Sequence, residues 1–143
     1  MSESRFAQLP ESEQENILFH LQLLKQSYEA FRAKEAFQDI ELDKDAIEFL
    51  ASFEKLIKDM VHLDPNHVFS GQKLVTLQIA KYPDLTECWA RDLLWYFGGD
   101  CLHYMPDDEI EKFQLIDEAR FEAIDQERPF EREKIRNRIL GLH

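Results

Sequence analysis

CWARDLLWYFGGDCLHYMPDDE, residues 88–109, is the stretch that decides how the chain divides into helices. Apolar side chains recur at helical spacing up to Phe97. The pair Gly98 and Gly99 then predicts a helix end, because glycine readily adopts the left-handed conformation that closes helices. Pro106 predicts the start of the next helix. Proline has no amide hydrogen, and the amides in the first turn of a helix have no hydrogen-bond partner within the helix. The acidic run at 107–109 suits the positive end of a helix dipole.

Three further helices are expected before this stretch. The first spans about residues 12–36, where Ser12 and Glu15 form a capping-box pattern. The second spans residues 45–62 and begins with a similar pattern at Asp45. A third, shorter helix covers residues 72–81, and a new start is expected at Asp84. The first helix carries one apolar stripe at spacings of four and three residues, formed by Ile17, Leu21, Leu24, Tyr28 and Phe31.

After the central stretch, the fifth helix is expected to continue through Ala123. Pro129 then separates a last helix that carries Ile135, Ile139 and Leu142. No segment shows the sustained period-two alternation that is typical of strands. We therefore predict an all-α protein, a single-domain bundle of five or six helices that covers residues 1–143.

Composition and charge narrow the classes of function. The chain has 143 residues, of which 44% are hydrophobic and 11 are phenylalanine, so a packed aromatic core is expected. Its net charge is −12, which repels nucleic-acid phosphates and anionic membranes. No nucleic-acid or membrane partner is therefore expected. An acidic surface that mimics DNA and occupies a basic protein is kept as an alternative.

The sequence favours a cytoplasmic location. Two cysteines are too few for a disulfide framework. The first residues have neither the basic nor the apolar region of a signal peptide, so none is expected. Apolar runs are far shorter than the roughly 20 residues that span a bilayer.

Several histidines and cysteines are candidate metal ligands. Cys88, Cys101 and His103 could supply three zinc ligands, with Asp100 or Asp107 as a fourth. Their spacing matches no common zinc finger, and buried cysteine is the commoner case. Three aspartate–histidine pairs have a spacing of three residues, which places both side chains on one face of a helix: Asp59 with His62, Asp64 with His67 and Asp100 with His103. Surface histidines beside an acid are the favoured interpretation, and no cofactor is expected.

The sequence patterns for a catalytic site are weaker than those for a metal site. Cys101 and His103 lie too close in sequence to give the geometry of a nucleophile and its base. An acidic face on the fifth helix could hold Mg²⁺, but the sequence offers no second acidic helix opposite it, so a solvated face is expected. That face is formed by Glu118, Glu122 and Asp125.

The aromatic residues of the central stretch are expected either in the core or at an interface. Trp89 continues the apolar stripe and is expected in the core, whereas Trp95 lies off it. We expect a non-enzymatic interaction or regulatory protein that forms a homodimer or binds another protein. An enzyme with a metal or small-ligand pocket around residues 88–109 is the alternative. The residues expected at an interface are Trp95, Tyr96, Ile17, Leu21, Leu24 and Tyr28.

Overall fold

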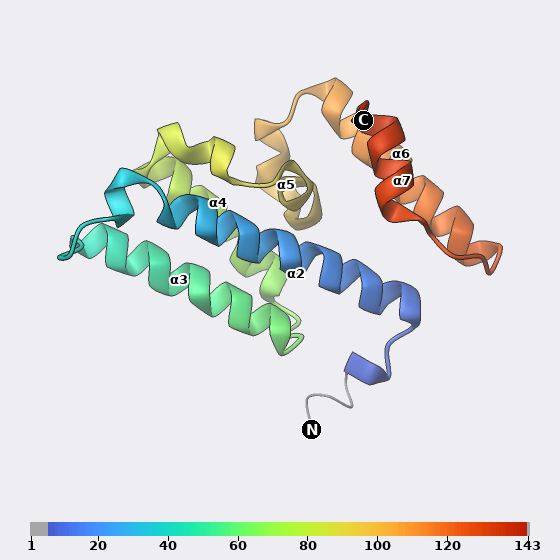
Figure 1. Cartoon of the computed structure of the whole chain (residues 1–143), viewed down its shortest axis with the longest axis horizontal. Helices are drawn as coiled ribbons and strands as arrows, with labels where there is room; N and C mark the ends of the chain where they lie inside the picture. The colour runs from blue at the N-terminus through green and yellow to red at the C-terminus, as the bar shows by residue number, and fades with distance from the viewer. Residues whose placement is uncertain (1–5, 143) are drawn as a thin grey trace. The chain divides into compact units, whose positions relative to one another are not determined.

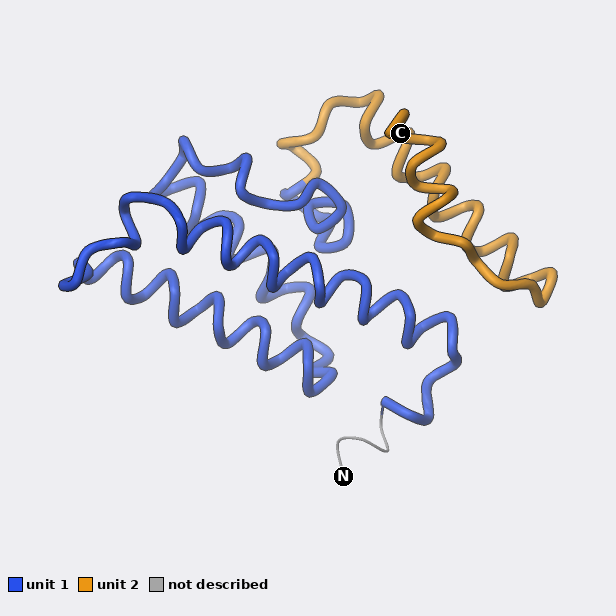
Figure 2. Tube along the Cα trace, in the orientation of Figure 1, with its two compact units in different colours: residues 1–101 blue, residues 102–143 orange. Residues whose placement is uncertain are grey.

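A computed structural model describes residues 6–142 of the chain (Figure 1). The elements in this range are helices, and none of these residues lies in a strand. The all-α prediction is therefore confirmed. The trace divides into two compact units, residues 1–101 and 102–143 (Figure 2), and a single bundle of five or six helices is not confirmed.

The first long helix, α2, spans Glu11–Arg32 and starts without the expected capping box. Pro10 is the N-cap residue, and its carbonyl oxygen accepts hydrogen bonds from the backbone amides of Glu13 and Gln14. No side chain caps this helix. The short 3-10 helix η1 follows at Glu35–Phe37 and carries the buried Phe37.

Two further helices of the same unit lie next to each other. Helix α3 spans Lys44–Val61 and packs against both α2 and α4, which spans His67–Lys81. The N-cap of α3 is Asp43, not the expected Asp45, because the Asp43 carboxylate accepts a hydrogen bond from the amide of Ala46 at 2.8 Å. The two helices run antiparallel, and Lys81 near the end of α4 pairs with Asp45 near the start of α3 at 3.6 Å.

The expected fourth helix is divided into two. Pro83–Cys88 forms the 3-10 helix η2, and α5 spans only Arg91–Phe97. Between them the backbone is extended, and the Ser27 hydroxyl of α2 accepts a hydrogen bond from the amide of Ala90 at 3.1 Å. The predicted stop is confirmed, because Gly98 has a φ of +65° and ends α5.

The core of residues 1–101 is built around Trp89, as expected. Its ring stacks on Phe53, with centroids 5.1 Å apart, and meets Phe31 edge-on at 5.1 Å. Its indole N–H donates to the side-chain oxygen of Gln78, which is fully buried. The Gln78 amide donates in turn to the Tyr82 carbonyl and the Thr86 hydroxyl, so this buried polar group is satisfied.

The second unit contains α6, Asp107–Asp125, and α7, Arg132–Leu140, which pack against each other. Pro106 precedes the first residue of α6, and three acids occupy its first turn, as predicted. Gly141, with a φ of +74°, ends α7. The 3-10 helix η3, Gly99–Tyr104, spans the division between the units.

Candidate functional site

The thiols of the central stretch are buried. Cys88 and Cys101 are 8% and 2% exposed. Burial raises the pKa of both thiols, that of Cys101 from 9.0 to about 11. A protonated thiol is a poor nucleophile and a poor metal ligand. Asp100, His103 and Asp107 are exposed, and nowhere in residues 6–142 do three potential ligands gather as a metal would require.

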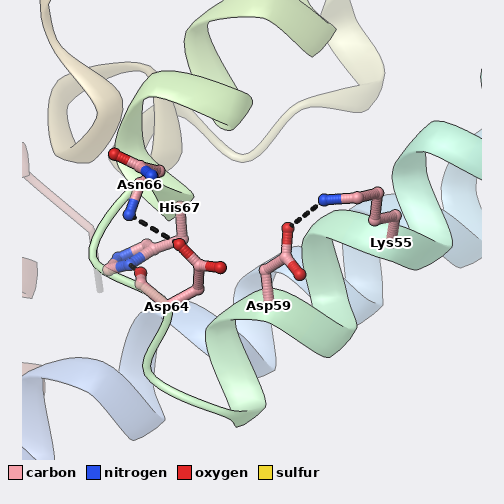
Figure 3. A network of polar contacts seen from close by, with 5 residues as sticks. All are labelled: Lys55, Asp59, Asp64, Asn66 and His67. Carbon is pink, nitrogen blue, oxygen red and sulfur yellow. Dashed lines mark hydrogen bonds and ion pairs between the residues drawn. The ribbon is translucent and has the colours of Figure 1, made fainter.

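In the two aspartate–histidine pairs at the end of α3 and the start of α4, the aspartates make contacts with residues nearby in the sequence (Figure 3). The Asp59 carboxylate binds Lys55 at 2.7 Å, and His62 lies exposed at the end of α3. The Asp64 carboxylate accepts a hydrogen bond from the amide of Asn66 at 2.8 Å. His67 bonds to the backbone carbonyl of Asp64, not to its carboxylate. These acids are therefore already used in turns and ion pairs.

The structure brings together two histidines and a tyrosine that the sequence did not connect. The His67 Nδ1–H donates to the Asp64 carbonyl at 2.8 Å, since a carbonyl only accepts. Nε2 of the same ring is hydrogen-bonded to the Tyr96 hydroxyl at 2.8 Å. The His20 ring stacks on Tyr96, with centroids 4.2 Å apart, and bonds to the carbonyl of Asn16. These contacts fix the rings of α2, α4 and α5 against one another.

The expected interface residues differ in how much surface they offer. Leu24 has no exposed surface, so it has none to give a partner. Tyr96 is half-buried and bonded to His67, and Tyr28 is half-buried against Phe53. Ile17, Leu21 and Trp95 are also half-buried.

The acids considered for Mg²⁺ lie on the exposed face of α6. Glu118, Glu122 and Asp125 are all exposed, and Glu122 pairs with Arg128 at 3.7 Å. A solvated acidic face is consistent with this arrangement.

A groove of about 400 Å³, which the sequence pattern does not predict, lies between α3 and α4. Three leucines line it, namely Leu56, Leu74 and Leu77. Its polar lining consists of Glu48, Ser52, Lys55, Asp59, Ser70 and Lys73. Lys55 is neutralised by Asp59, and the Lys73 ammonium lies 5.4 Å from the centre of the Phe69 ring. The groove therefore combines apolar residues with a charge-balanced polar lining.

The same two helices expose three large apolar side chains. Ile47 and Val61 on α3 are 57% and 49% exposed, and Phe69 on α4 is 60% exposed. We define the α3–α4 surface as the groove together with these three residues. Exposed apolar area concentrated in one region is typical of binding sites.

Crossing a bilayer demands a length and an apolar content that no helix within residues 6–142 combines. No curated protein and no solved structure matches the chain. The sequence profile of the PA2817-like family matches residues 12–143, which is nearly the whole chain. The chain therefore belongs to the PA2817-like family.

Proposed function

We propose that this protein is a cytoplasmic, non-enzymatic interaction module that acts as a homodimer. The α3–α4 surface carries the proposal, because Ile47, Val61 and Phe69 leave apolar area exposed on two helices that pack against each other. Fully burying one such side chain stabilises by about 1.5–3 kcal/mol. Covering the exposed halves of Ile47, Val61 and Phe69 would therefore contribute about 3 kcal/mol before the cost of association.

The groove supports a role in binding a second protein. Its volume of about 400 Å³ is enough for one or two apolar side chains of a partner, seated on Leu56, Leu74 and Leu77. The net charge of −12 favours a partner whose contacting segment is basic, because complementary charge speeds encounter. Nucleic acid is disfavoured by the same charge.

An enzyme with a pocket around residues 88–109 has less support. The raised pKa of Cys101 keeps the thiol protonated at neutral pH, and Cys88 shares its burial. The alternative function as a DNA mimic is supported only by the net charge, and many acidic proteins have a similar charge.

Native mass spectrometry of the purified protein across a dilution series tests the proposal. We expect a species of twice 17.0 kDa that dissociates on dilution. Val61→Glu should shift the equilibrium toward monomer, because Val61 is 49% exposed on α3. The matched control is Leu18→Glu, on an α2 residue that is 52% exposed, and this variant should leave the equilibrium unchanged.

A wild-type protein that stays monomeric at every concentration would overturn the homodimer. A retained metal or small molecule in the spectrum would instead move the enzyme interpretation to first place.

A further inference from the structure

The outward face of α3 carries a regular stripe of exposed residues. Its members recur at spacings of four, three, four and three, which keeps them on one side of a helix. We call them the outer α3 stripe: Ile47, Ala51, Glu54, Lys58 and Val61, all exposed. The opposite face of α3 supplies buried core residues, among them Phe53 and Met60.

The stripe is self-complementary when two copies meet antiparallel. Around a two-fold axis, positions at equal distances from the axis face each other. With the axis level with position 56, Glu54 faces Lys58 of the second copy, and Lys58 faces its Glu54. Ala51 then faces Val61 of the second copy, a small residue against a larger one.

Charge selects this arrangement over the alternatives. In a parallel pair each residue faces its own counterpart, so Glu54 would meet Glu54 and Lys58 would meet Lys58. The antiparallel pair replaces both repulsions by two reciprocal ion pairs. The stripe also carries no net charge, whereas the whole chain carries −12, so pairing of the stripes avoids bringing the acidic surfaces of two copies together.

Ile47 and Tyr28 lie at the borders of the same contact. Ile47 is nine residues from the axis and faces the turn that follows α3 in the second copy. Tyr28 on α2 lies beside Glu54, whose carboxylate adds to the effect of burial in raising the pKa of the Tyr28 hydroxyl. The neighbouring α2 thus supports one edge of the stripe.

We propose that two copies of this chain associate through antiparallel pairing of the outer α3 stripe, with Glu54 of each opposite Lys58 of the other. This inference rests on the homodimer proposed above and assigns its contact surface. The stripe from 47 to 61 is about 21 Å long, enough for four helical turns to contribute.

Charge reversal and charge exchange test the pairing. Glu54→Lys and Lys58→Glu each turn two attractions into two repulsions, so each should raise the dimer dissociation constant by roughly tenfold or more. The double variant Glu54→Lys/Lys58→Glu restores both pairs and should return the constant to within about threefold of wild type. Sedimentation equilibrium at low salt measures all of these constants.

A matched exchange on the same helix is the control. Lys55→Glu/Asp59→Lys exchanges a salt-bridged pair that has the same spacing but faces the groove, and it should leave the dissociation constant unchanged. Circular dichroism establishes that every variant keeps its helix content.

Each result has a distinct meaning. A monomeric wild type would overturn the homodimer and this inference together. A dimer that both single reversals leave unchanged would keep the homodimer but refute the α3 contact. A double variant no tighter than the single variants would refute the antiparallel pairing of Glu54 with Lys58.

Discussion

Replacing Gly71 by alanine should destabilise the protein, although alanine is the better helix former. Gly71 is buried within α4, and a Cβ added there would lie 2.7 Å from Cζ of Phe97 and closer still to its Cδ1 and Cε1. Phe97 is 2% exposed, and its ring meets those of Trp89 and Tyr96. The ring therefore has little room to move away.

Two opposing terms set the magnitude. Alanine in a helix interior gains about 1 kcal/mol over glycine. Forcing an extra methyl group into a packed core costs about 1–3 kcal/mol, and close contact with three ring atoms places this case at about 2–3 kcal/mol. We expect a net loss of about 1–2 kcal/mol, which lowers the melting temperature by roughly 3–8 °C.

Urea unfolding followed by circular dichroism gives the free energy of unfolding of each variant in a double-mutant cycle. Phe97→Leu removes the obstructing ring edge, so the pair with Gly71→Ala should lose at least about 1 kcal/mol less than the sum of the single losses. The difference in stability between Thr76→Ala and Thr76→Gly, at an exposed interior position of the same helix, measures the propensity term. A Gly71→Ala protein that is about 1 kcal/mol more stable would refute the reasoning, because the ring would then move aside without cost.

Three further outcomes are expected. Gln78→Leu leaves the indole N–H of Trp89 without its acceptor and should cost about 1–3 kcal/mol in urea unfolding, while a loss below about 0.5 kcal/mol would contradict the buried network. Tyr82→Phe should keep or raise stability by up to about 1 kcal/mol, because the buried Tyr82 hydroxyl has no hydrogen-bond partner within residues 6–142, and a loss would show otherwise. Native Cys101 should react with a thiol reagent at pH 8 about 100-fold more slowly than in urea, measured in a Cys88→Ser variant, since its pKa lies near 11 and not at 9.0. Because the folded pKa is the higher one, the Cys101 contribution to stability is full below pH 9.0 and falls as the pH rises toward 11, and equal labelling rates would contradict this.

The sequence predicts the helix content from its periodicity, and it predicts helix ends where glycine or proline acts on the local backbone. Gly98 and Pro106 mark real boundaries, because their backbone preferences do not depend on distant residues. The caps were harder to predict, because Asp43 and Asp45 are both possible N-cap residues for the same helix. The path of the chain into α3 selects Asp43, whose carboxylate accepts from the amide of Ala46. The break before α5 depends on Ser27, a residue 63 positions from the amide of Ala90 that it binds.

The candidate site was the least predictable part. The groove forms where α3 and α4 meet, so its lining exists only after the helices pack. The bond from Tyr96 to His67 joins residues 29 positions apart and leaves no local pattern. The interface expectation at Leu24 came from periodicity, which finds an apolar face but does not say whether the protein itself covers that face.

Because Trp89 is buried in the core, its fluorescence is an intrinsic probe of unfolding. Both tryptophans lie within residues 1–101, so tryptophan fluorescence reports from this unit, whereas far-ultraviolet dichroism sees every helix. In a Trp95→Phe protein, tryptophan emission would come from the stacked, hydrogen-bonded indole of Trp89 alone. Coincident transitions by the two signals would mean that the units unfold as one cooperative body, and separated transitions would mean that each melts by itself.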